Sequence, residues 1–175
     1  MGKGNRGRFI WYELATRDVP AAVAFYGDVA RWKTEPFGDD YTMWVGSQGP
    51  LGGLRPLTPD EAAVPPYWTS HVIVEDVDAT AARVRERGGK VLFGPHDIPE
   101  VGRFAVIADP QGAVLSIFRP GGPMELHDLA REGEFCWNEL MTSDHVAGFA
   151  FYSALFGWKV LQDLDMGPLG TYRLF

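Results

Sequence analysis

Phe9 to Lys33 reads FIWYELATRDVPAAVAFYGDVARWK, and Phe135 to Lys159 reads FCWNELMTSDHVAGFAFYSALFGWK. The second stretch starts 126 residues after the first, and 12 of the 25 aligned positions are identical without a gap. Two amphipathic helices that merely look alike would not share the tryptophan, glutamate and threonine that precede them. The repeat therefore indicates a duplicated structural unit.

Each copy predicts a strand that leads into a helix. Asp18 can cap the helix because its carboxylate accepts hydrogen bonds from free first-turn amides, and Pro20 suits the first turn. Apolar residues at helical spacing then predict one buried stripe on that helix. They are Ala22, Phe25, Tyr26 and Val29.

A weaker echo lies inside the first copy, where Asp76 aligns with Asp18. A strand over 70–74 again leads into a helix over 76–87, with Val77, Ala81 and Val84 facing inward. The turn Asp109-Pro110-Gln111-Gly112 predicts a hairpin further on. The strands expected in this part of the chain are 9–16, 41–45, 51–57, 70–74, 90–93, 103–108 and 113–119.

The same patterns divide the chain into segments. Residues 1–8 are expected to be a flexible tail, and 9–120 one domain of two modules, 9–62 and 67–120. A linker over 121–134 follows, because Gly-Gly-Pro and mixed charges carry no periodic pattern. Residues 135–175 are expected to start a second, incomplete copy, with a strand after Phe135, a helix over 144–156 and a strand over 172–175.

Composition narrows the class of protein. The net charge is −7 and the pI about 5.0, which argues against nucleic acid or an anionic membrane as partner. No apolar run approaches the ~20 residues of a membrane span. The single cysteine, Cys136, excludes an internal disulfide and fits a reducing, cytoplasmic compartment. Since aromatic residues flank it, Cys136 is expected to be buried in a core.

Two motifs carry a family resemblance: Asp18…Phe25-Tyr26…Trp32, and its repeat Asp144…Phe151-Tyr152…Gly157-Trp158. Both resemble modules of the vicinal-oxygen-chelate superfamily of glyoxalases, bleomycin-resistance proteins and extradiol dioxygenases. The resemblance implies an α+β fold in which paired βαβββ modules form a curved mixed sheet around a cleft, with helices outside. It also leaves open a homodimer that pairs modules between chains.

The resemblance places metal ligands at four positions, which here hold Trp11, Gly52, Thr69 and Ser116. None is histidine, aspartate or glutamate, the residues that such a divalent metal prefers alongside glutamine. No cofactor is therefore expected. The alternative is a divalent metal held weakly by Glu13 and His71, with Ser116 and water.

Glu13 and His71 are the candidate catalytic pair. Strand alternation turns Glu13 toward the expected cleft, and the weaker repeat aligns it with His71. A neighbouring carboxylate would raise the pKa of His71 and could make an acid–base pair. The alternatives to a catalytic role are a structural hydrogen-bonded pair and two independent exposed groups.

Three functions remain after these observations. The first is a protein that binds a small, aromatic molecule in the cleft. The second is a lyase or dioxygenase of the glyoxalase type, using a metal or the pair Glu13 and His71. The third is an interaction module whose own side chains fill the cleft. The expected ligand-binding residues are Trp11, Glu13, Trp44, His71, Phe104, Ser116 and Phe118.

Overall fold

The structure, a computed structural model, describes residues 5–124, 126 and 130–175. Its fold is α+β, as predicted, and both expected modules show the element order βαβββ. The chain divides into two compact units, which we call the α1 unit (Phe9–His71 and Glu125–Asn138) and the α2 unit (Met1–Arg8, Val72–Met124 and Glu139–Phe175). The predicted domain boundaries themselves stay a prediction, and residues 1–4, 125 and 127–129 of the expected tail and linker lie outside the described residues.

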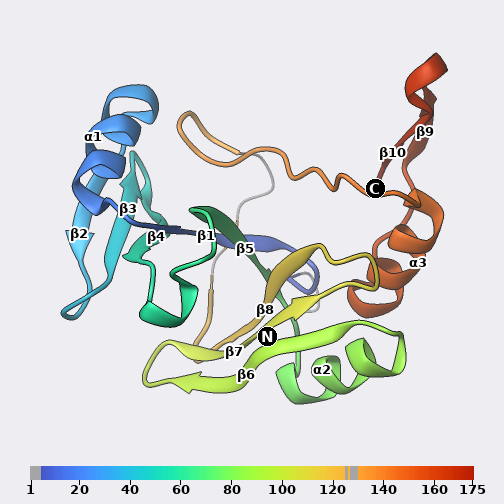
Figure 1. Ribbon diagram of the computed structural model, residues 1–175, viewed down its shortest axis with the longest axis horizontal. Helices are drawn as coiled ribbons and strands as arrows, with labels where there is room; N and C mark the ends of the chain where they lie inside the picture. The colour runs from blue at the N-terminus through green and yellow to red at the C-terminus, as the bar shows by residue number, and fades with distance from the viewer. Residues whose placement is uncertain (1–4, 125, 127–129) are drawn as a thin grey trace. The chain divides into compact units, whose positions relative to one another are not determined.

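In the α1 unit a sheet of mixed direction carries α1 on one face (Figure 1). The strand order is β2-β3-β4-β1-β5, with β1 parallel to β4 and β3 antiparallel to both β2 and β4. The elements are β1 (Phe9–Thr16), α1 (Val19–Ala30), β2 (Lys33–Pro36), β3 (Thr42–Gly46), β4 (Gly49–Pro56), the short helix η1 (Pro59–Glu61) and β5 (Tyr67–Ile73).

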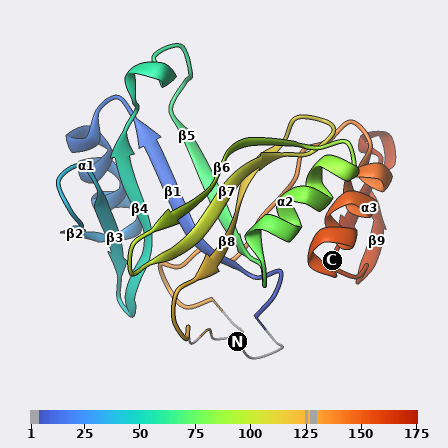
Figure 2. The ribbon, with the colours of Figure 1, turned by 90° about the horizontal axis from the view of Figure 1, so that it is seen from below.

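In the α2 unit the strands continue in the order β8-β7-β6, and α2 runs along them (Figure 2). Val72 and Ile73, the end of β5, belong to this unit, and the next residue, Val74, donates its N–H to the Phe118 carbonyl at 2.9 Å. The elements are α2 (Val77–Glu86), β6 (Lys90–Ile98), β7 (Gly102–Ala108), β8 (Val114–Pro120), α3 (His145–Phe156), β9 (Gln162–Asp165), the short helix η2 (Gly167–Leu169) and β10 (Thr171–Leu174).

Both helices of the long repeat begin as the sequence predicts. The Asp18 carboxylate accepts from the amide of Ala21, and the Asp144 carboxylate accepts from the amides of Val146 and Ala147. Helices α1 and α3 have the same length and start 126 positions apart. The inward residues predicted for α2, Val77, Ala81 and Val84, are also buried.

The buried stripe predicted for α1 is half wrong. Ala22 and Tyr26 pack on the core around Leu14, but Phe25 is 58% exposed and Val29 68% exposed. The contact with the sheet is made by the i, i+3, i+4, i+7 set that starts at Val19, so Phe25 and Val29 fall on the next face.

The strand expected after Phe135 is also wrong, since residues 135–142 contain no strand. A strand needs a partner along its edge, and β1 obtains one from β4. The segment instead exposes Cys136, which corrects the expected buried thiol.

Candidate functional site

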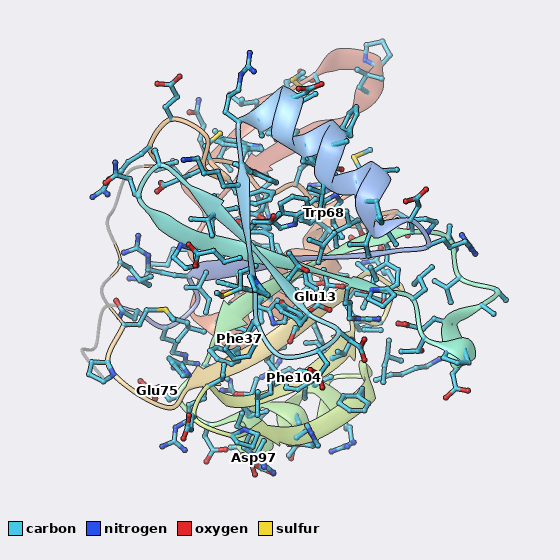
Figure 3. The ribbon with its side chains drawn as sticks, turned by 90° about the vertical axis from the view of Figure 1, so that its left-hand side faces the viewer. Glu13, Phe37, Trp68, Glu75, Asp97 and Phe104 are labelled. Carbon is cyan, nitrogen blue, oxygen red and sulfur yellow. The ribbon has the colours of Figure 1, made fainter. Side chains whose placement is uncertain are left out.

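The side of β1 and β4 that faces away from α1 carries a charged network in the α1 unit. Parallel pairing sets Glu13 opposite Gly53, and Arg55 follows two residues later on the same face. The Arg55 Nε–H donates to Glu13 Oε1 at 2.9 Å. Figure 3 shows Glu13 away from α1, whereas Trp68 lies on the helix side.

The Arg55 guanidinium has no N–H group left to offer a ligand. Its terminal nitrogens donate to both carboxylate oxygens of Glu61 at 2.7 and 2.9 Å, to the Tyr67 hydroxyl at 3.0 Å and to the Pro56 carbonyl at 3.1 Å. Together with the bond to Glu13, this uses all five donors of an arginine. Arg55 therefore orients its neighbours rather than binding a ligand itself.

Glu61 is held in place by its own helix. The short helix η1 begins with a capping box, in which the Thr58 amide donates to Glu61 Oε2 at 2.8 Å. The Tyr67 hydroxyl donates to the other oxygen at 2.5 Å. The Arg55 guanidinium and these donors hold the pKa of Glu61 well below its usual range, so this carboxylate stays ionised.

Trp11 and Tyr41 extend the network with aromatic surface. The Trp11 indole N–H donates to the Tyr41 hydroxyl at 2.8 Å. Burial, and then the charge of Glu13, raise the pKa of Tyr41 far above its ordinary value, so its hydroxyl keeps its proton. Gly53 makes room for this ring, because a Cβ at position 53 would lie 2.1 Å from the Tyr41 hydroxyl oxygen.

His71 lies close enough to Glu13 to feel its charge, but its pKa moves opposite to the prediction. Burial is the larger influence and lowers the pKa to about 4, while Glu13 pulls it upward. The ring is partly exposed, yet its Nε2 atom is closed off from solvent, which explains why desolvation of the charged form prevails. His71 is therefore neutral at neutral pH.

Four other predicted ligand-binding residues lie elsewhere. Trp44 is fully buried with Leu14 and Leu54 beneath α1, so its expected place in the cleft lining is wrong; its strand position points it to the helix side. The remaining three belong to the α2 unit. There Ser116 is fully buried and donates to the Ala105 carbonyl, Phe118 is 8% exposed, and Phe104 lies near Phe93 and His96 on β6 and β7 (Figure 3).

The four positions where the family resemblance places metal ligands do not suit a metal. Gly52 has no side chain, and a Cβ there would meet the Tyr12 carbonyl oxygen at 2.2 Å. Trp11 supplies an indole N–H, which is a donor only, and Thr69 and Ser116 supply buried hydroxyls. Across the described residues, no three His, Cys, Asp or Glu side chains gather where they could hold an ion. The donor set therefore does not fit the family's divalent metal.

The sequence reasoning missed Arg55, Tyr41, Glu61 and Tyr67. A signal for Glu61 was present, because Thr58-Pro59-Asp60-Glu61 is a capping-box sequence. A signal for Arg55 was also present, since it shares strand parity with Gly53. Tyr41 had no such signal, because it precedes β3 and reaches the network only through the space over Gly53.

The α2 unit has hollows of its own, but they are not built from predicted site residues. One of about 600 Å³ is bordered by charged Glu75 and Arg119, and one of about 400 Å³ lies beside Asp109 and Gln111.

None of the described helices combines the length and apolar character that crossing a bilayer requires.

Comparison with known proteins places these features in a family context. The model of a family described as the glyoxalase/bleomycin resistance protein/dioxygenase superfamily matches residues 8–117. The anthracycline biosynthesis protein DauV of Streptomyces sp. (strain C5) is 32% identical in an alignment 178 positions long that covers 92% of this chain and 63% of that protein.

Two further proteins resemble the chain. CFP32 of Mycobacterium tuberculosis (strain CDC 1551 / Oshkosh), a protein named as a glyoxylase, is 39% identical over 118 residues, which cover 65% of this chain and 44% of CFP32. The chain thus spans less than two thirds of either relative's length. The Mn(II)-bound glyoxalase from Novosphingobium aromaticivorans has the same fold, with a TM-score of 0.63 at 20% identity over 89% of this chain and 54% of that chain.

Proposed function

The chain belongs to the glyoxalase/bleomycin resistance protein/dioxygenase superfamily, and from this premise we propose that it binds a small molecule with fused aromatic rings. The ligand lies on the face of the α1 unit that presents Trp11, Tyr41 and Glu13. The names of relatives such as DauV, an anthracycline biosynthesis protein, support this class of ligand. The domain's own donor set, which does not fit a metal, favours binding over a metal-assisted reaction.

The fixed geometry around Glu13 is the observation that carries the proposal. Arg55 holds one carboxylate oxygen, and it in turn is held by Glu61 through two bonds. Glu13 is therefore a preorganised acceptor for a ligand hydroxyl or ammonium group, beside an indole and a phenol ring that offer flat apolar surface. The formal charges of Glu13, Glu61 and Arg55 sum to −1, and the lowered pKa of His71 means that this ring adds no positive charge at neutral pH.

An anthracycline is the probe for this proposal, and isothermal titration calorimetry is the assay. We expect saturable binding by the purified chain, weakened about 10- to 100-fold by Glu13→Gln, because a charged hydrogen bond contributes about 1.5–3 kcal/mol. Glu35→Gln, at an exposed carboxylate on β2 of the same unit, is the matched control and should leave affinity unchanged. No binding at millimolar anthracycline, or equal affinity in Glu13→Gln, would exclude the proposed site.

Metal analysis of the same protein decides between binding and a metal-assisted enzyme. The residues in the family's ligand positions predict far less than one Mn, Zn, Ni or Fe ion per chain. Stoichiometric metal that is lost in Glu13→Gln or His71→Ala would overturn the binding proposal in favour of the enzyme. We also propose a reducing, cytoplasmic setting, because the one cysteine is an exposed thiol.

A further inference from the structure

Two glycine turns, one before each copy of the repeat, have the same conformation. In residues 5–8 the Arg8 amide donates to the Asn5 carbonyl at 3.3 Å, and in residues 131–134 the Glu134 amide donates to the Arg131 carbonyl at 3.0 Å. Gly7 and Gly133 both have φ +81, in the left-handed region that glycine adopts without strain. The duplication therefore extends four residues upstream of the quoted repeat.

Each glycine turn is bonded to the tryptophan of the other copy. Within the α1 unit the Trp32 indole N–H donates to the Gly133 carbonyl at 2.6 Å. Within the α2 unit the Trp158 indole N–H donates to the Gly7 carbonyl at 2.8 Å. Trp32 and Trp158 are equivalent positions, 126 residues apart, and so are Gly7 and Gly133. Each copy therefore donates from its tryptophan to the glycine turn of the other copy.

Each of the two glycines also lies against the end of the helix that belongs to the other copy. A Cβ on Gly133 would lie 3.6 Å from the carbonyl oxygen of Ala30, the last residue of α1. A Cβ on Gly7 would lie 3.0 Å from the carbonyl oxygen of Phe156, the last residue of α3. Ala30 and Phe156 are again 126 positions apart, so each turn is seated against the end of the other copy's helix.

One contact joins a position to its own equivalent. The Asn138 side-chain amide donates to the Tyr12 hydroxyl at 2.8 Å, and these residues are 126 apart. Phe135 stacks on the Tyr12 ring, with the ring centroids 3.7 Å apart, and adds apolar contact beside this hydrogen bond. In a head-to-tail pairing the two partners use different surfaces, whereas in an isologous pairing residue i meets j, j meets i, and one position meets itself.

We infer that the two copies pair through an isologous interface, in which each copy docks its glycine turn on the other copy's tryptophan and helix end. The surface made by Tyr12, Trp32 and the end of α1 is thus an interaction surface whose fitting partner is a second copy of the same βα segment. In this chain residues 131–138 occupy it. One difference between the two sides remains: Arg6 also donates to the Leu155 carbonyl, and its equivalent Glu132 has no N–H to donate from its side chain.

Hydrogen exchange on the full chain tests the exchanged contacts. We expect Trp32→Phe to speed exchange of the amides in 131–138 about fivefold, the ratio for one lost neutral hydrogen bond, without affecting residues 5–8. Trp158→Phe should do the converse. The two variants control for each other, because each removes the same indole bond from a different glycine turn. Unchanged exchange at 131–138 in Trp32→Phe would overturn the inference.

Exchanging Tyr12 and Asn138, the two equivalent positions that contact each other, distinguishes an isologous interface from a contact that works in one direction only. Tyr12→Asn alone shortens the side chain and removes the stack on Phe135, so the melting temperature should fall. Adding Asn138→Tyr restores the same pair in the opposite order, which an isologous interface accepts, and at least half of the fall should be recovered. A double variant no more stable than Tyr12→Asn would show that the contact works in one direction only, and would overturn the inference.

Discussion

Removal of the Arg55 guanidinium is the sharpest test of how the α1 unit holds its charged face. Arg55→Met leaves the Glu13 and Glu61 carboxylates close together without the cation between them. The three side chains are only 20–24% exposed, so the cost lies nearer to that of breaking a buried ion pair than an exposed one. We expect a loss of about 3 kcal/mol in the free energy of unfolding.

Urea unfolding followed by tryptophan fluorescence measures this loss where it occurs. Every tryptophan except Trp158 belongs to the α1 unit, so the signal reports mainly on that unit. Arg17→Met is the matched control: this exposed arginine donates to the carbonyls of Ala62 and Val64, and its loss should cost less than about 1 kcal/mol. Arg55→Lys should fall between the two, because an ammonium has three donors and cannot bind Glu61 in the same planar geometry.

The pH dependence gives the same prediction an independent check. Arg55 lowers the pKa of Glu61 below the unfolded carboxyl value of 4.5. A lowered pKa contributes stability that is complete above the unfolded value and is lost as pH falls through the folded one. The difference between wild type and Arg55→Met should therefore be constant above pH 4.5 and shrink below it. A difference equal to that of Arg17→Met, or one that persists unchanged in acid, would refute this account.

Three further predictions concern single side chains. The pKa of His71 is lowered from 6.5 to about 4, so protonation of this ring favours the unfolded chain. Between pH 6.5 and 4 the wild type should therefore lose up to about 3 kcal/mol of its free energy of unfolding, and His71→Gln should not. Urea unfolding at both pH values measures the difference. Gly53→Ala should displace the Tyr41 ring and lower both the melting temperature and the affinity for an anthracycline, whereas Gly122→Ala, with nothing within 4 Å of its added Cβ, should change neither. Tyr152→Phe removes the buried hydrogen bond to Asp109 at 3.0 Å and should lower the free energy of unfolding by about 1–3 kcal/mol. Faster hydrogen exchange in α3 measures this loss, and unchanged exchange would show that the bond does not stabilise the helix.

The repeat predicted those parts of the fold that depend on local sequence. Asp18 and Asp144 cap their helices by local hydrogen bonds, so both helix starts followed from the residue pattern. The strand after Phe135 did not follow, because a strand depends on a partner that the local pattern does not contain. The same limit explains Phe25, whose burial depends on what covers the outer face of α1 rather than on its helical spacing.

The candidate site itself stays a prediction, but the structure corrects one point of its chemistry, the direction of the His71 pKa. Strand alternation placed Glu13 and Trp11 on one face, and the weaker repeat brought His71 near Glu13. The predicted direction of the His71 pKa was wrong because burial, which depends on packing from several elements, outweighs one nearby charge. Arg55 escaped notice because an arginine on a strand is ordinarily a solvated group, and only the position of η1 brings Glu61 to it.

The position of Arg55 gives a reason why this face can keep its shape without a metal ion. Two carboxylates side by side need a cation between them, and a protein can supply a metal ion or a basic side chain. A guanidinium is always protonated and satisfies both carboxylates with directed bonds, so the arrangement does not depend on metal supply or on pH near neutrality. Because its five donors are all used, Arg55 offers the proposed ligand no hydrogen bond, and the proposal assigns the acceptor to Glu13 and the flat contacts to Trp11 and Tyr41. The affinity change in Glu13→Gln and the stability change in Arg55→Met should therefore separate: the first acts on binding, the second on the frame that holds the acceptor in place.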